Sequence, residues 1–165
     1  MGMMDDIFSV AGIRVESLEG LQLQSENPTF LIQGLNDKRI VANNSIYVAD
    51  PCVFKHNEQL NLFVELLLKN GRGVIAKTEW KSETNEWGDL EIIISEDYHL
   101  SYPRIIPYKD KLYMSVESAE SHDVQLYEAV ENDLASWKPS QKIIDGVYYD
   151  PTIFQMNGNW YMFAC

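Results

Sequence analysis

The chain has 165 residues, 45% of them hydrophobic, which is long enough for one ordinary globular domain. It carries 25 acidic and 13 basic residues, and the resulting formal charge of −12 repels nucleic acid and anionic membranes, so neither is an expected partner. No apolar run approaches the roughly 20 residues that a membrane-spanning helix needs.

The N-terminus lacks the features of a secretory signal. Aspartates at 5–6 stand where a signal peptide has positive charge, and the apolar stretch that follows is interrupted at Arg14 and Glu16. Cys52 and Cys165 show neither metal-ligand spacing nor a disulfide-rich pattern. These features predict a reduced, cytoplasmic protein.

Residues 1–48 do not repeat elsewhere in the chain. Two segments within them have the composition of strands, namely 7–15 and 38–48. Turn-forming residues separate the two segments, at Gly20, 27–28 and 34–36.

A 17-residue pattern then occurs three times, at 49–65, 101–117 and 149–165. The copies read ADPCVFKHNEQLNLFVE, SYPRIIPYKDKLYMSVE and YDPTIFQMNGNWYMFAC, and they align without gaps at offsets of 52 and 48 residues. Each runs from a polar residue through proline, a short apolar strand and a tight turn to a second apolar strand. A period near 50 with two strands in each visible unit is typical of a β-propeller blade.

The rest of the first two units also aligns, because 73–94 lies over 123–144 at a constant offset of 50. Each full unit therefore reads as four strands rich in Val, Ile, Phe, Tyr and Trp. The expected strands are 51–56, 60–68, 73–80 and 87–94, then 103–108, 111–117, 123–130 and 137–144. In the third copy, Asn157-Gly158 is a strong hairpin signal.

These patterns predict an all-β chain that forms a partial β-propeller of about two and a half four-stranded blades. The blades are 49–94, 101–144 and a half blade at 149–165, and residues 1–48 would supply strands that close a blade. Strand 159–165 would be left with an unpaired apolar edge. A second copy of the chain, residues 1–48 or downstream sequence could cover this edge. We favour a homodimer with two-fold symmetry, the commonest closed assembly.

Repeat geometry also predicts where polar residues gather. The innermost strands of a propeller begin at one mouth of its channel, and Asp50, Tyr102 and Asp150 occupy that position in successive units. The second strand returns to the same end, where Glu65 and Glu117 close the first two units. Four carboxylates and a tyrosine should therefore share one rim.

Carboxylates held close together shift one another's pKa values, and glycoside cleavage uses such a pair. Aspartate before proline is also ordinary turn chemistry at the start of a strand, so both interpretations stay open for Asp50 and Asp150. Glu65 and Glu117 follow purely apolar strands, which favours a site. His99 lies on the connection between units, where it could bind a sugar hydroxyl or satisfy backbone groups of its loop.

At these residues the chain resembles the five-bladed propellers of the furanosidase-type glycoside hydrolases, families 43, 32, 68 and 130. It is most similar to the propeller domain of glucosamine inositolphosphorylceramide transferases. The shared stretches are 49–51, 96–103, 112–114 with 117–118, 126–129 and 149–154, and EDYHLSYP at 96–103 is the most specific.

The resemblance implies roles for two aspartates. Asp50 matches the general base of the family-43 hydrolases, and Asp150 matches the aspartate that orients the general acid and tunes its pKa. The acid itself comes from a fourth blade in that family, and residues 1–165 contain no such unit.

We therefore expect a carbohydrate-recognising, glycoside-hydrolase-like propeller with an acidic channel mouth. Asp50 and Asp150 are the candidate catalytic residues, and the candidate substrate-binding residues are Tyr102, Glu65, Glu117 and His99. The expected partners are a small saccharide and a second copy of the chain. No cofactor is expected, with Ca²⁺ or a similar hard cation at the channel as the open alternative. A non-catalytic assembly module and a fragment of a longer enzyme are the competing interpretations, and whether the chain is an enzyme stays open.

Overall fold

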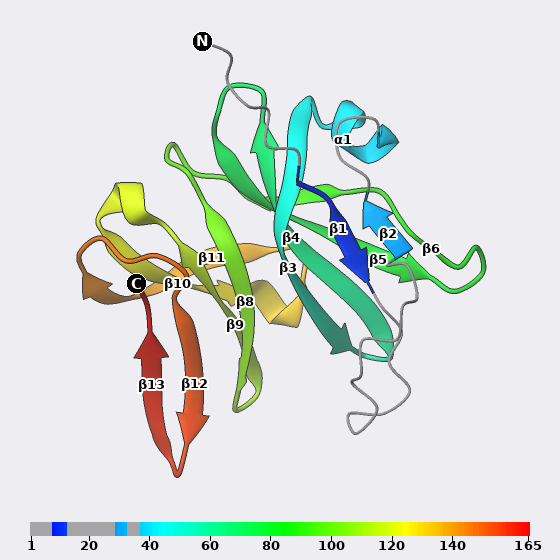
Figure 1. Cartoon of the computed structure of the whole chain (residues 1–165). Helices are drawn as coiled ribbons and strands as arrows, with labels where there is room; N and C mark the ends of the chain where they lie inside the picture. Colours follow the sequence, from blue (N-terminus) through cyan, green and yellow to red (C-terminus); the bar gives the residue numbers. More distant parts are fainter. Residues whose placement is uncertain (1–7, 13–28, 33–36) are drawn as a thin grey trace, which may run out of the picture.

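Short antiparallel sheets follow one another along the chain (Figure 1). The structure, a computed structural model, describes residues 8–12, 29–32 and 37–165. Its helix and strands are β1 (Val10–Gly12), β2 (Thr29–Ile32), α1 (Lys38–Ala42), β3 (Ser45–His56), β4 (Gln59–Leu68), β5 (Gly73–Lys81), β6 (Glu86–Trp87), β7 (Glu91–Ile94), β8 (Ser101–Tyr108), β9 (Lys111–Glu117), β10 (Asp123–Ala129), β11 (Trp137–Asp145), β12 (Thr152–Met156) and β13 (Asn159–Phe163). The predicted all-β fold is confirmed.

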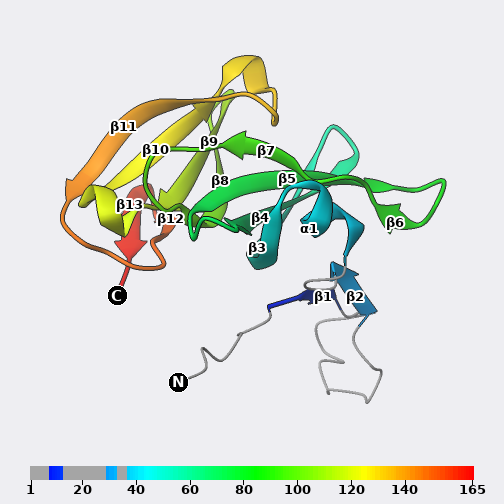
Figure 2. The ribbon, with the colours of Figure 1, turned by 90° about the horizontal axis from the view of Figure 1, so that it is seen from above.

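The sheets correspond to the repeat units. The first contains β3, β4 and β5, and both β6 and β7 pair with β5. The second has the order β8-β9-β10-β11, and the third is the hairpin of β12 and β13. Seen from above, the first two sheets diverge like successive blades around an axis (Figure 2). This arrangement is a partial propeller, as the repeat predicts.

Strand β4 is buried on both faces, which explains its nearly continuous apolar sequence. Leu62, Val64 and Leu66 pack on one side with Val10 and other residues of the N-terminal part. Phe63 projects to the other side, into the core shared with the second sheet. Because successive side chains of a strand alternate between faces, one strand fills two layers of the core.

The core between the first and second sheets is made of large, fully buried side chains. Phe63 contributes from β4, Met114 from β9 and Tyr127 from β10, and none of them is more than 1% exposed. Leu100, on the connection between the two sheets, is also fully buried in this core. Such burial stabilises the fold by about 25 cal/mol per Å² of apolar surface, and it fixes the orientation of neighbouring blades.

The strand predicted at 38–48 is wrong in its first half. Residues 38–42 form α1, because the Asp37 side chain caps the helix by accepting the backbone N–H of Arg39 at 2.9 Å. Ile40 of this helix is completely buried. Strand β3 begins at Ser45 and runs without a break to His56, so it joins the second half of the predicted strand 38–48 to the predicted strand 51–56.

The structure describes two short strands before residue 37. Within the predicted strand 7–15 the structure describes a strand at Val10–Gly12, while residue 7, residues 13–15 and the three predicted turns lie outside the described residues. Strand β1 pairs with β2, and this two-stranded sheet packs on β3 and β4 on the side away from β8 (Figure 1). The role of residues 1–48 in closing a blade stays a prediction.

Two local features refine the predicted hairpins. The single strand predicted at 87–94 is divided into β6 and β7. Gly88 still donates its N–H to the carbonyl of Glu79 at 2.9 Å, in the register of β6, whereas Glu91 pairs with Lys77, so the pairing with β5 shifts by one residue between 88 and 91. The Asn157-Gly158 turn is confirmed, with φ values of 52° and 80° between the paired residues Met156 and Asn159. Positive φ at both central residues is the signature of a type I′ hairpin turn.

Candidate functional site

A β-bulge occurs at the start of the innermost strand in every unit. Ala49 pairs with Glu65 while Cys52 pairs with Phe63, so two residues of β3 oppose one residue of β4. In the second unit Ser101 pairs with Glu117 and Arg104 with Ser115, so two residues of β8 again oppose one residue of β9. In the third unit Tyr149 exchanges backbone bonds with Cys165 and Thr152 pairs with Phe163, which again leaves two residues opposite one. Bulges of this kind re-aim side chains and are frequent beside active sites.

The first residue of each bulge is the one that repeat geometry predicted at the mouth. Asp50, Tyr102 and Asp150 have φ values of 51°, 50° and 50°. This left-handed conformation is costly for residues other than glycine, and for a residue as bulky as tyrosine it is rare. The three equivalent positions therefore share the same strained backbone conformation. The bulge itself does not require a tyrosine at position 102.

Hydrogen bonds tie these positions together across the units. The backbone N–H of Tyr102 donates to Asp50 Oδ2 at 3.2 Å, across 52 residues of sequence. The backbone N–H of Asp150 donates to Glu117 Oε2 at 2.8 Å. The Tyr102 hydroxyl lies 3.2 Å from Thr152 Oγ1 of the third unit. The structure thus brings Asp50, Tyr102, Glu117 and Asp150 together at one rim.

Glu117 has an environment that favours its neutral form. Burial raises the pKa of this carboxyl above its ordinary value of 4.5, and the nearby charges of Asp150 and Asp50 raise it further. The hydrogen bonds from the Asp150 backbone and the Ser101 side chain act in the opposite direction. The Glu117 carboxyl is therefore close enough to both aspartates to be affected by their charges.

Glu65 and His99 form a second polar pair. Glu65 is 5% exposed, and its Oε1 lies 3.2 Å from His99 Nε2, with no other hydrogen-bond partner in the described part of the chain. This carboxylate raises the pKa of the His99 imidazole, while burial of the ring lowers it. The backbone N–H of Gly73 donates to His99 Nδ1 at 3.1 Å, which directs the Nε2 proton of the neutral ring toward Glu65.

The connection that carries His99 is anchored at several points. The Tyr127 hydroxyl donates to Glu96 Oε1 at 3.1 Å, and burial raises the pKa of this phenol. The backbone N–H of His99 donates to Glu120 Oε2 at 2.9 Å, and that of Leu100 donates to the carbonyl of Gly73 at 3.0 Å. These bonds give a structural role to the specific EDYHLSYP stretch.

Gly73 is the position where this anchoring leaves least space. A Cβ at residue 73 would lie 2.4 Å from the carbonyl oxygen of Leu100 and 2.7 Å from His99 Nε2. We expect Gly73→Ala to destabilise the protein by about 1–3 kcal/mol and to displace the His99 ring, because the contacting carbonyl cannot move freely. Urea unfolding and the NMR signals of the imidazole would measure both effects.

Gly88→Ala is the matched control for this substitution. Its added Cβ would meet chiefly the flexible end of Lys81 at 3.0 Å, so its stability should change by only about 0.5 kcal/mol. Equal stability losses in the two variants would contradict the close packing assigned to Gly73.

A cavity of about 400 Å³ opens beside this rim. Its lining residues are His99, Glu117, Ala119, Glu120, Val147 and Tyr149. Glu120 and Tyr149 were not predicted as site residues. Glu120 follows Glu117 by three positions, on a connection where the repeat gives no register. Tyr149 directly precedes Asp150 and is the first residue of the third copy of the pattern, where the other copies have Ala49 and Ser101. Asp50 and Tyr102 lie on the adjoining rim and do not line this cavity.

The described residues show no preformed metal centre. Among residues 8–12, 29–32 and 37–165, no group of three or more His, Cys, Asp or Glu side chains is arranged to hold a metal ion. A larger, apolar cavity of about 420 Å³ lies between the second sheet and the third hairpin, and no carboxylate lines it. In the same described part of the chain, no helix has the length and hydrophobicity to cross a membrane.

Comparison with solved structures shows the fold. The chain is similar to "Bacteroides ovatus Xyloglucan PUL GH43B" with a TM-score of 0.59, over 84% of this chain and 28% of that one. Because the sequence identity is only 12%, this likeness is evidence for the propeller architecture alone.

Sequence comparison adds curated relatives. The chain is 31% identical over 121 residues to glucosamine inositolphosphorylceramide transferase 1 of Oryza sativa subsp. indica, and 30% identical over 139 residues to the protein of that name in Arabidopsis thaliana. These matches cover 73% and 82% of the chain, which spans only 16% and 17% of the length of those relatives. Residues 19–165 match the family described as glucosamine inositolphosphorylceramide transferase 1, N-terminal, and the chain belongs to this family.

Proposed function

We propose that the rim formed by Asp50, Tyr102, Glu117 and Asp150 binds a saccharide. The observation that carries the proposal is the shared left-handed bulge at three equivalent positions, joined by hydrogen bonds between units. Strained backbone that is repeated in this way points to a selected function of the side chains it presents. The relatives named for glucosamine and the neighbour named for xyloglucan support a sugar ligand.

The side chains have suitable chemistry for sugar hydroxyls. Asp50 and Asp150 offer carboxylate acceptors, which form the stronger, charge-assisted hydrogen bonds. Tyr102 offers its hydroxyl and one ring face, because the guanidinium of Arg104 covers the other face at 3.8 Å from the ring centroid. His99, held by Glu65, adds a polar group at the neighbouring cavity.

Asp50 and Asp150 are the candidate catalytic residues for any reaction of the bound sugar. The resemblance to family-43 hydrolases makes Asp50 the candidate base and Asp150 the candidate residue that tunes an acid. Cleavage also needs a protonated group facing the departing oxygen. The proposed function is therefore recognition of a saccharide, with Asp50 and Asp150 as the candidates for any reaction.

Calorimetric titration with a panel of saccharides, beginning with glucosamine and xyloglucan oligosaccharides, tests this function. We expect saturable binding by the wild-type chain, and binding that Asp50→Asn weakens. A thermal-shift series with Ca²⁺ and with EDTA tests the alternative that the carboxylates hold a structural cation. Such a cation would raise the melting temperature without any sugar. Absence of binding across the panel would contradict the proposal.

A further inference from the structure

The cavity of about 400 Å³ beside the rim lies between two segments that are bonded to each other. One segment is the short 3-10 helix Ala119–Ser121, and the other is the connection 146–149 that leads to the third unit. The backbone N–H of Gly146 donates to the carbonyl of His122, the residue after the helix, at 2.8 Å. The two sides of the cavity are therefore held in place, as in most preformed ligand sites.

Two carboxyl groups line this cavity, and each is anchored by a backbone N–H. Glu120 accepts the N–H of His99 at 2.9 Å. Glu117 accepts the N–H of Asp150 at 2.8 Å, so it belongs to the rim as well as to the cavity. A carboxyl group has about four acceptor positions when ionised and donates an O–H when protonated, so both glutamates can still bind hydroxyl groups of a ligand.

Tyr149 supplies an exposed aromatic ring to the same cavity. The equivalent positions of the first two units hold the small residues Ala49 and Ser101, so the repeat itself does not call for a ring here. The Tyr149 backbone is fixed by two hydrogen bonds with Cys165, at 3.1 and 3.0 Å. Tyr149 is nevertheless 51% exposed, and Val147 beside it is 44% exposed. Exposed apolar surface at a cavity with polar groups is typical of ligand-binding sites.

This combination of groups matches one ring of a saccharide. A sugar ring has an apolar face of C–H groups, which can pack on the ring of Tyr149, and hydroxyl groups around its edge, which can donate to Glu117 and Glu120. The volume of about 400 Å³ lies within the range of about 300–1,000 Å³ that small-molecule sites have. The cavity therefore has the size and the chemistry for a sugar.

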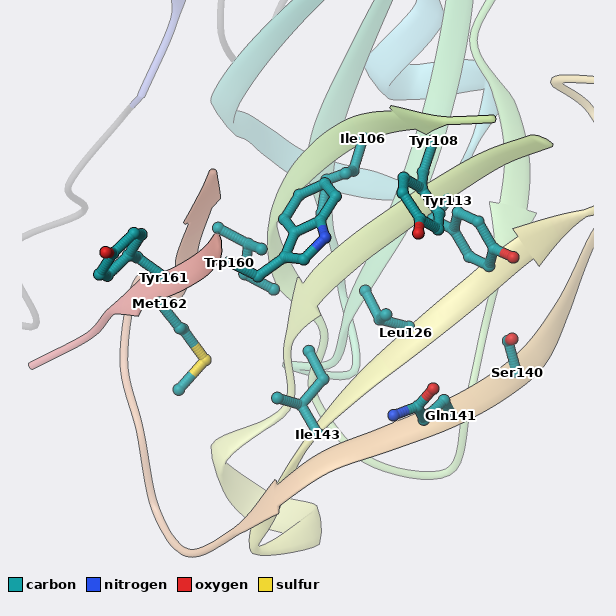
Figure 3. A pocket seen from close by; sticks show the side chains of 11 residues that line it. Ile106, Tyr108, Tyr113, Leu126, Ser140, Gln141, Ile143, Trp160, Tyr161 and Met162 are labelled. Atoms are coloured by element: carbon teal, nitrogen blue, oxygen red, sulfur yellow. The ribbon is translucent and has the colours of Figure 1, made fainter. Parts of the chain in front are cut away.

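The cavity between the second sheet and the third hairpin has different chemistry. Leu126, Ile143 and Trp160 are among the side chains that line it (Figure 3), and the described residues of its lining include no carboxylate. Placing sugar hydroxyls against such apolar side chains would cost free energy, because the hydroxyls would lose hydrogen bonds to water. The cavity beside the rim is therefore the better match for a sugar.

We propose that this cavity is a second saccharide subsite, in which the ring of Tyr149 stacks on the sugar next to the one bound at the rim. The inference rests on the proposed binding of a saccharide at the rim, and it narrows the ligand to oligosaccharides of two or more sugars. Glu117 lies where the two sugars meet, because it contacts Asp150 at the rim and lines the cavity. A monosaccharide fills only one of the two places and should bind more weakly.

Calorimetric titration tests this subsite with two pairs of sugars, glucosamine with its β-1,4-linked dimer and glucose with cellobiose. Wild type should bind at least one dimer about tenfold more tightly than the matching monosaccharide. Tyr149→Ala should remove this advantage, about the effect of one aromatic contact, and Tyr149→Phe should restore it. Tyr161→Ala is the control, because it removes a tyrosine ring that does not line this cavity and should bind both sugars like wild type. Circular dichroism would show that each variant is folded.

Asp50→Asn separates the failure of this subsite from the failure of the rim. It should weaken the monosaccharide and the dimer by the same factor, whereas Tyr149→Ala should weaken only the dimer. If Asp50→Asn weakens binding but Tyr149→Ala binds the dimer like wild type, the subsite is overturned and the proposed function stands. Equal affinities of wild type for monosaccharide and dimer would also overturn the subsite. If wild type binds none of the four sugars, the subsite and the proposed function are both contradicted.

Discussion

Phe63→Ala should destabilise the protein by about 3–5 kcal/mol, which is the usual range for truncating a fully buried phenylalanine. The Phe63 ring is 0% exposed and lies edge to face with Trp137 at 6.5 Å between centroids. It stands between the first two sheets, so its removal leaves a cavity at their interface. A loss of this size is a large part of the total stability of about 5–15 kcal/mol that a domain has.

Denaturant unfolding followed by tryptophan fluorescence and far-UV circular dichroism would measure this loss. Val53→Ala is the control, because Val53 is 56% exposed on β3 and its truncation should cost about 0.5 kcal/mol or less. Should Phe63→Ala fail to fold, Phe63→Leu would give a smaller, measurable loss. A cost near that of Val53→Ala would show that the two sheets do not share this core.

Asp50→Asn should weaken saccharide binding by at least about tenfold and leave the fold intact. Asparagine tolerates the left-handed conformation that Asp50 adopts at φ 51°, and its carbonyl oxygen can still accept the Tyr102 N–H. Only the negative charge is removed. Hydrogen bonds to charged groups contribute about 1.5–3 kcal/mol, and about 1.4 kcal/mol corresponds to a tenfold change in affinity.

Calorimetry of wild type, Asp50→Asn and Asp110→Asn would measure the effect. Asp110 lies in the exposed turn between β8 and β9, so Asp110→Asn makes the same chemical change away from the rim. Its affinity should equal that of wild type. Equal affinities for all three proteins would remove Asp50 from the proposed site, whereas equal losses would point to net charge as the cause.

Strand positions could be predicted from the sequence because the units repeat and strand composition is distinctive. The convergence of Asp50, Tyr102 and Asp150 could be predicted for the same reason, since equivalent residues of successive units occupy equivalent places. The shared bulge was not predicted. The proline that follows each of the three residues gives no signal for it, because a residue before proline favours extended backbone with negative φ, and these three residues have φ near 50°.

Features outside the repeat could not be predicted in this way. The five-residue helix α1 contains β-branched residues typical of strands, and only Asp37, its capping residue, indicates a helix. Glu65 and His99 lie 34 residues apart, and His99 belongs to a connection, so their contact depends on packing around Leu100. Glu120 reaches the cavity from a connection as well.

A carbon-13 NMR titration of the Glu117 carboxyl tests most directly that far-apart units meet at one rim. Asp50 and Glu117 are 67 residues apart in sequence. We predict that the pKa of Glu117 lies above its ordinary value of 4.5, and that it falls in Asp50→Asn because a repelling charge is removed. If the pKa of Glu117 is not raised and does not respond to Asp50→Asn, Asp50 and Glu117 do not share a site.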